Sequence, residues 1–290
     1  MTMPKISAVI NTRNEERNLR ECLETVQWCD EIVVVDMESE DRTVEIAREY
    51  TDRVFTHKKI LAFDAARNFA VGKATGDWIL LVDADEMVPK ALADRLLDVA
   101  AGDDADVVEI LFRHYIMGDW VRHSGWGLTP LPRFFRRGKV LFGETVHDYI
   151  HKDPAARTLR LDSSPGHCIH HFSYEDSSRF VEKMNRYSSI EAARLLGNGI
   201  RYSVPRLLVA SLREFAGRFL KGKGYKDGPR GFSLCLMMAF YRALSHIKLW
   251  ELETFSEDPV ARKYESMRRG ILDPWKKNPP SSSRGDTPPR

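Results

Sequence analysis

The sequence predicts an α/β protein, in which an open, mainly parallel sheet with helices on both faces precedes a helical C-terminal region. Three observations lead to this prediction. Strand and helix patterns alternate through the first hundred residues, which is typical of parallel sheets. The segment EIVVVD at 31–36 is almost continuously apolar, as expected of a strand covered on both faces. From Ser177 onward the apolar spacing is helical.

The first hundred residues are predicted to form four strand–helix units. Asn14 is expected to N-cap the first helix, and Pro89 suits the first turn of the fourth. The predicted strands are residues 5–10, 31–36, 53–58 and 77–83. The predicted helices are residues 15–26, 39–50, 63–74 and 89–100.

Beyond residue 105 the pattern changes. The segments VVEILFRHYI, PRFFRR and HCIHHFSY are expected to be strands of a mixed sheet. Helices are expected at 177–196, 204–220, 232–254 and 258–269. The Pro/Ser-rich end predicts disorder. We therefore divide the chain into a sheet domain at 1–175, a helical region at 176–272 and a disordered tail at 273–290.

Composition excludes several classes of protein. The four cysteines lack a CxxC pair and suggest free thiols in a reducing compartment. The N-terminus does not resemble a signal peptide, and no apolar run reaches the ~18 residues of a membrane span. Residues 1–100 hold 13 Lys+Arg and 20 Asp+Glu, whereas 201–250 hold 10 and 2. The overall charge of +2 and the lack of a recognised motif argue against nucleic acid as a partner.

Polar clusters follow three of the predicted strands, at 11–15, 36–41 and 83–86. Ligands of open parallel sheets bind outside the carboxyl ends of the strands, so these clusters are expected along one edge. Asp83 and Asp85, two residues apart at a strand end, suit a hard divalent cation such as Mg²⁺ or Mn²⁺ together with phosphate oxygens. The simpler alternative is an acidic loop that caps the next helix.

The other polar residues near these strand ends are candidates for contact with a nucleotide. Each has a simpler alternative: N-capping by Asn14, an ordinary acidic strand end at Asp36, and a solvated helix surface at Arg67. The candidates for the nucleobase, ribose and diphosphate are Thr12, Arg13, Asn14, Glu15, Asp36, Arg67 and Asn68.

Together, the strings AVINTRNEERNL, IVVVDMESEDRTVEIA and AARNFAVGKATGDWILLVDADE resemble the family 2 glycosyltransferases, inverting enzymes with a GT-A fold. The resemblance covers roughly the first 90 residues. It implies a nucleotide-sugar donor and a metal on the donor's diphosphate, held by the DxD motif of Asp83 and Asp85. It also assigns Glu38 and Ala84 to the donor site.

A second resemblance covers much of the remainder, through RFFRRGKVLFGETVHDYI, HHFSYEDSSRFVEKMNRYSSIEAA and KDGPRGFSLCLMMAFYRALSHIKLWE. These strings are similar to the lipopolysaccharide core β-glucosyltransferase subgroup. That subgroup has a His-Glu pair where this chain has His147-Asp148, which makes Asp148 the first candidate for the catalytic base. Inversion needs a carboxylate to remove the acceptor proton, and the other candidates after the DxD are Glu144 and, less favoured, Asp119. The subgroup also suggests His171 as a third metal ligand, although a strand histidine is more often a polar core residue.

The predicted helix at 204–220 has one apolar stripe and a basic opposite face. Such a helix can lie on an anionic membrane surface, or it can simply turn its stripe to the core. We favour the membrane surface because Arg and Lys outnumber the acids.

The implied activity is the metal-dependent transfer of a hexose from a nucleotide-sugar, most simply UDP-glucose, to a lipid-linked saccharide such as lipopolysaccharide core. The implied location is peripheral, on the cytoplasmic face of the membrane. The alternatives are transfer to a polyprenyl phosphate or to another envelope or capsular glycan, and a non-catalytic nucleotide- or glycan-binding protein. A phosphatase phosphorylated on Asp83 is disfavoured, because that chemistry places its aspartates after an early strand.

Overall fold

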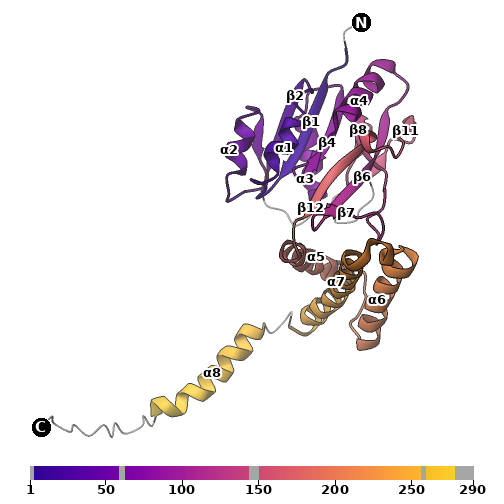
Figure 1. Ribbon diagram of the computed structural model, residues 1–290. Coiled ribbons are helices and arrows are strands. Elements are labelled where there is room, and N and C mark those ends of the chain that lie inside the picture. Colours follow the sequence, from indigo (N-terminus) through magenta and orange to yellow (C-terminus); the bar gives the residue numbers. More distant parts are fainter. Residues whose placement is uncertain (1–2, 59–62, 144–149, 256–258, 278–290) are drawn as a thin grey trace, which may run out of the picture.

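The computed structural model describes residues 3–58, 63–143, 150–255 and 259–277 (Figure 1). The main sheet contains β1 (Ile6–Thr12), β2 (Glu31–Asp36), β3 (Val54–Thr56), β4 (Trp78–Asp83), β5 (Glu86–Met87), β6 (Val107–Ile116), β8 (Leu131–Arg136) and β12 (Cys168–Tyr174). Their order is β3-β2-β1-β4-β8-β6-β12-β5. Two short strands, β7 (Asp119–Trp120) and β11 (Thr158–Arg160), pair with β6, while β9 (Val140–Leu141) pairs with β10 (His151–Lys152).

The first half of the sheet is parallel, because β1 pairs with β2 and β4 in the same direction and β2 pairs likewise with β3. Four helices accompany it: α1 (Leu19–Glu24), α2 (Thr43–Arg48), α3 (Phe63–Lys73) and α4 (Lys90–Gly102). Leu23, Ile46 and Leu96 from α1, α2 and α4 share one buried cluster. Ala70 of α3 packs with Val9 in a second cluster, on the other face. The predicted α/β fold with helices on both faces is confirmed.

The second half of the sheet is mixed, as predicted. β8 lies antiparallel between β4 and β6, and β12 pairs with β6 in parallel. The short strand β5 turns back from the end of β4 to pair with β12. Within this pairing the backbone N–H of Phe172 donates to the carbonyl of Asp85 over 2.8 Å. The topology therefore brings the end of β12 beside the end of β4.

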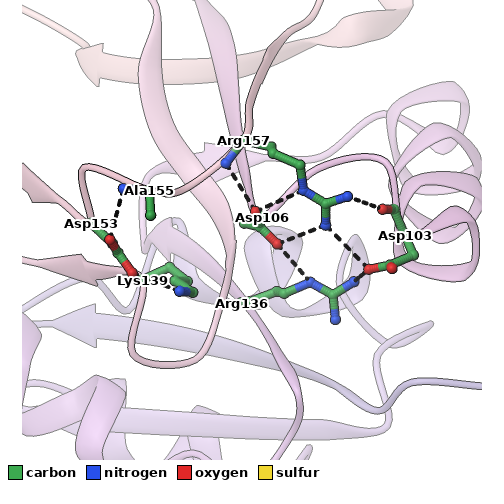
Figure 2. Close-up of polar contacts among 7 residues, drawn as sticks. All are labelled: Asp103, Asp106, Arg136, Lys139, Asp153, Ala155 and Arg157. Atoms are coloured by element: carbon green, nitrogen blue, oxygen red, sulfur yellow. Dashed lines mark hydrogen bonds and ion pairs between the residues drawn. The ribbon is translucent and has the colours of Figure 1, made fainter.

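An ion-pair cluster fixes the chain that follows β10 to the start of β6 (Figure 2). Asp106 accepts hydrogen bonds from the guanidinium of Arg157 at 3.0 Å, and Arg136 approaches it at 3.2 Å. Arg157 also lies 3.3 Å from Asp103, which follows α4. The cluster holds the loop before β11 against one end of the sheet, away from the strand ends that bear the polar clusters.

The N-terminal helices differ from the predictions at their starts. Asn14 does not cap α1: its backbone is left-handed, with φ of 54°, and its side-chain oxygen accepts the N–H of Glu40. Asn18 stands at the N-cap of α1 instead. The loop before α2 is longer than expected, and Pro89 precedes α4 rather than entering it. The loop after β1 and the loop after β2 bind each other through contacts such as that of Asn14 with Glu40. These contacts compete with the first turns of the predicted helices.

The C-terminal region contains α5 (Ser177–Gly197), α6 (Val204–Ala216), α7 (Gly228–Phe255) and α8 (Val260–Lys277). Arg242 of α7 ties three helices together, because it contacts Glu191 of α5 at 3.1 Å and Glu214 of α6 at 3.0 Å. α8 leads away from this bundle (Figure 1) and continues to Lys277, into the range predicted to be a disordered tail.

Candidate active site

A cavity of about 520 Å³ opens at the carboxyl ends of β1 and β4, and α5 and the end of β12 close its other side. Its size is typical of small-molecule sites. The residues that line it are Asn11, Thr12, Arg13, Asn14, Glu15, Asn18, Asp83, Ala84, Asp85, His171, Phe172, Ser173, Tyr174, Glu175, Arg179, Glu182, Lys183, Arg186 and Tyr187. The structure thus brings together the first and third of the polar clusters predicted from the sequence.

The end of β1 presents buried polar groups to the cavity. Asn11 and Thr12 are only 2% and 1% exposed. Within the part of the chain that the structure describes, the Asn11 amide nitrogen and oxygen and the Thr12 hydroxyl have no hydrogen-bond partner. Buried polar groups in proteins are normally paired. A polar ligand in this cavity would supply the missing partners.

Asp83, at the end of β4, is held by two arginines. Its carboxylate accepts hydrogen bonds from Arg67 at 2.9 and 3.1 Å and from Arg133 at 2.9 Å. Burial would raise the pKa of Asp83, but the charges of Arg133 and Arg67 outweigh it and hold that pKa well below its usual range. Arg133 also binds the buried Glu86 at 3.0 Å. Arg67 therefore reaches the site through Asp83.

Asp85 lies within hydrogen-bond distance of His171 in the lining of the cavity, with 3.2 Å between Asp85 Oδ2 and His171 Nε2. Burial would lower the pKa of the His171 imidazole, but the Asp85 carboxylate raises it above its usual value. The other ring nitrogen of His171 lies 3.0 Å from Nδ1 of His114, a contact that fixes the orientation of the ring. As expected from strand alternation, His170 points elsewhere and contacts Tyr115 at 3.2 Å.

The Asp85–His171 pair suits a divalent cation in part. Among the described residues, no three His, Cys, Asp or Glu side chains form a complete ligand set. Mg²⁺ commonly takes only one or two carboxylates and completes its shell with waters and substrate phosphates. Carboxylate and water oxygens suit Mn²⁺ as well, and histidine is a common metal ligand in proteins. Asp85 and His171 fit such a partial site, whereas both oxygens of Asp83 face arginine.

Glu15 is the most strongly perturbed acid in the loop after β1. Burial, with the nearby charge of Asp85, raises its pKa to about 7. Its carboxylate accepts a hydrogen bond from Asn18 at 2.8 Å, and its backbone N–H donates to Thr43 at 2.8 Å. These contacts hold Glu15 over the cavity near Asp85.

Several predicted site residues do not line the cavity. Asp36 accepts the backbone N–H of Ser39 at 3.0 Å, and Ser39 in turn accepts the N–H of Asn14. Asn68 is occupied by Phe142, whose carbonyl and N–H its amide binds at 2.7 and 3.0 Å. Glu38 is exposed, with a left-handed φ of 56°. Glu144 and Asp148, the candidate bases, lie outside the described residues.

The sequence reasoning missed the cationic wall that α5 adds to the cavity, which consists of Arg179, Lys183 and Arg186. Burial would lower the pKa of Lys183, but Tyr174 and Asp85 raise it, so the amine stays charged. Its nitrogen lies 5.0 Å from the centre of the Tyr174 ring. The only sequence signal was the spacing of these cations at three and four residues, which places them on one helical face.

The family model described as "Glycosyl transferase family 2" matches residues 7–157. An uncharacterized glycosyltransferase of Rickettsia typhi is 28% identical over 89% of this chain and 91% of its own. The lipopolysaccharide core biosynthesis glycosyltransferase LpsC of Rhizobium meliloti is 26% identical over 89% of this chain and 97% of its own. Among solved structures, glucosyl-3-phosphoglycerate synthase from Mycobacterium tuberculosis, in complex with Mn²⁺ and UDP-glucose, is 21% identical, with a TM-score of 0.34 over 38% of this chain and 44% of that one.

Proposed function

The chain belongs to glycosyl transferase family 2, and from this premise we propose that it moves a hexose, most simply glucose from UDP-glucose, to a saccharide of a lipid-linked glycan. The observation that carries the proposal is the cavity in which the ends of β1 and β4 face the cations of α5. Lipopolysaccharide core as the acceptor is supported by the name of the Rhizobium meliloti relative, matched over nearly its whole length.

The donor nucleotide would lie along the end of β1. Asn11 and Thr12 offer buried polar atoms there, and Arg13, Asn14 and Glu15 follow in the loop that lines the cavity. Asp36 and Glu38 would act through the neighbouring loop. Asp36 accepts the backbone N–H of Ser39, and the Ser39 hydroxyl in turn accepts the backbone N–H of Asn14. Asn68 would support the site only indirectly, through Phe142.

A divalent cation, Mg²⁺ or Mn²⁺, would neutralise the diphosphate of the donor and stabilise its charge as it leaves. Asp85 and His171 are its proposed direct ligands, and Asp83 would contribute through water. The arginines on Asp83 keep that carboxylate ionised and fixed. Lys183, charged and partly buried in the same cavity, would stabilise the departing nucleoside diphosphate as well.

Inversion requires a base. The acceptor hydroxyl attacks the anomeric carbon, its proton passes to a carboxylate, and the bond from that carbon to the diphosphate breaks. We propose Asp148 for this role, with Glu144 as the second choice. Both belong to the segment between β9 and β10. An Asp148→Asn variant should lose kcat by about 10²-fold or more and keep donor binding, whereas Glu144→Gln should lose less.

We propose that the enzyme works at the cytoplasmic face of a membrane, where a lipid-linked acceptor would be held. No helix in the described ranges is long and apolar enough to cross a bilayer. The apolar stripe predicted at 204–220 divides in two: Phe215 and Phe219 both pack edge-on against Phe232 of α7, as the core-facing alternative expected. Leu208 and Leu212 are 52% and 68% exposed and remain candidates for membrane contact.

The test is a thermal-shift screen of UDP-, ADP-, GDP- and CMP-sugars with and without MnCl₂. At equal concentration, the ligand with the higher affinity for the native state raises the melting temperature more. We expect UDP-hexoses with Mn²⁺ to give the largest shift. Transfer of labelled glucose to lipopolysaccharide core should then be lost in Asp85→Ala. Donor binding with neither transfer nor hydrolysis would favour the non-catalytic alternative, and transfer to polyprenyl phosphate would favour the other acceptor.

A further inference from the structure

The last helix, α8, turns nearly its whole surface to solvent. Every residue from 261 to 277 is exposed, and the helix leads away from the rest of the molecule (Figure 1). Helices without tertiary packing are marginal in water. Pro274 lies inside this one and removes a backbone hydrogen bond. A helix of this kind gains stability from a surface that covers it.

The exposed side chains of α8 are sorted into faces. Tyr264, Met267, Ile271 and Trp275 are 54%, 62%, 67% and 61% exposed. Their spacing of three, four and four residues places them within an arc of roughly 80° on an α-helix. They form a continuous apolar stripe that nothing in the described chain covers, which sets α8 apart from the half-covered stripe of α6.

Cations surround this stripe. Residues 260–277 contain six Lys or Arg and two Asp or Glu, so the helix carries a net charge of +4. Lys263 and Arg268 stand at the two edges of the stripe on a helical projection, while Arg269 lies opposite it. A surface that complements α8 must therefore be apolar in its interior and negative at its rim, which describes the interface of an anionic bilayer.

We propose that α8 is an interfacial anchor that lies in the plane of an anionic membrane, with Ile271 and Trp275 inserted among the acyl chains and the cations at the lipid headgroups. Aromatic side chains such as Trp275 and Tyr264 favour that depth. The role of this anchor, to hold the enzyme beside a lipid-linked acceptor, rests on the proposed function. Lipid binding by α8 itself does not require sugar transfer.

The experiment is vesicle flotation of the full chain with phosphatidylcholine vesicles that contain 30% phosphatidylglycerol, or none. We expect binding to the anionic vesicles and about tenfold or greater weakening without phosphatidylglycerol. Ile271→Ser with Trp275→Ser should weaken it by a similar factor, because both lose apolar area. Arg268→Gln with Arg269→Gln should weaken it less steeply and remove part of its salt dependence. The matched control, Leu236→Ser with Phe240→Ser, changes two exposed apolar residues of α7 that are likewise four positions apart.

Undiminished binding of the Ile271/Trp275 variant would overturn the proposal, as would loss of binding in the α7 control alone. Equal binding to neutral vesicles would contradict the proposed preference for an anionic membrane. A dimer that Ile271→Ser dissolves, without vesicle binding by the wild type, would assign the stripe to a second copy instead. The thermal shift with UDP-sugar and Mn²⁺ is measured on the same variants. Its preservation separates a failure of the anchor from a failure of the proposed activity.

Discussion

Arg133 is the buried cation that both carboxylates at the end of β4 share. It is 5% exposed, and its guanidinium binds Asp83 at 2.9 Å and the 1%-exposed Glu86 at 3.0 Å. Replacing Arg133 by Met keeps most of the side-chain volume, and with it the packing over Phe112, but leaves Glu86 buried with no cation from this residue. Breaking one partner out of a buried pair costs about 3–5 kcal/mol. We expect Arg133→Met to lower the free energy of unfolding by that amount.

The assay is urea unfolding at pH 7.5, followed by circular dichroism, with Arg157→Met as the matched control. Arg157 also binds two carboxylates, Asp106 and Asp103 (Figure 2), but it is 50% exposed, so water screens these ion pairs and its loss should cost far less than the loss of Arg133. Adding Glu86→Gln to Arg133→Met should restore part of the loss, because it removes one uncompensated charge. Equal costs for the two arginines would refute the reasoning.

Three further outcomes follow from the site. His171→Ala should raise the Mn²⁺ concentration needed for half of the donor-induced thermal shift by about tenfold or more, and an unchanged titration would exclude His171 as a ligand. The raised pKa of Glu15 stabilises the fold below its usual pKa and ceases to do so as pH rises through about 7. Wild type should therefore lose about 1–3 kcal/mol of unfolding free energy between pH 5 and 8 relative to Glu15→Gln, and parallel pH curves would contradict this. Lys183→Met should lower kcat by about 10²-fold while Lys183→Arg recovers much of it, and a full-rate Met variant would remove Lys183 from the reaction.

The parallel half of the sheet could be predicted because burial on both faces leaves a direct trace in the sequence. β2 contains an unbroken apolar run at 32–35, and β1 and β4 are buried along almost their whole length. The polar residues that end β1 and β4 then had to meet at one edge of the sheet. That rule correctly placed Thr12 and Glu15 in one cavity with Asp83 and Asp85.

The rest of the site depends on contacts that no local pattern encodes. No local pattern predicts that β8 lies between β4 and β6. This strand order places Arg133 beside Asp83. The pairing of β12 with β6 sets His114 opposite His171, although the two are far apart in the chain. Asn14 does not form the predicted helix cap, because its side chain binds the loop after β2, a tertiary contact that overrides the local signal.

The central claim is that Asp85 helps to join a cation to the diphosphate of a nucleotide in the cavity at the ends of β1 and β4. Calorimetric titration of UDP, in MnCl₂ and in EDTA, tests it on wild type and Asp85→Asn. The control is Asp94→Asn, which alters an exposed aspartate paired with Lys90 on α4. We predict Mn²⁺-dependent binding of UDP that survives in the control and falls at least about tenfold in Asp85→Asn. Binding of equal strength in all three proteins, or in wild type with and without Mn²⁺, would contradict the account.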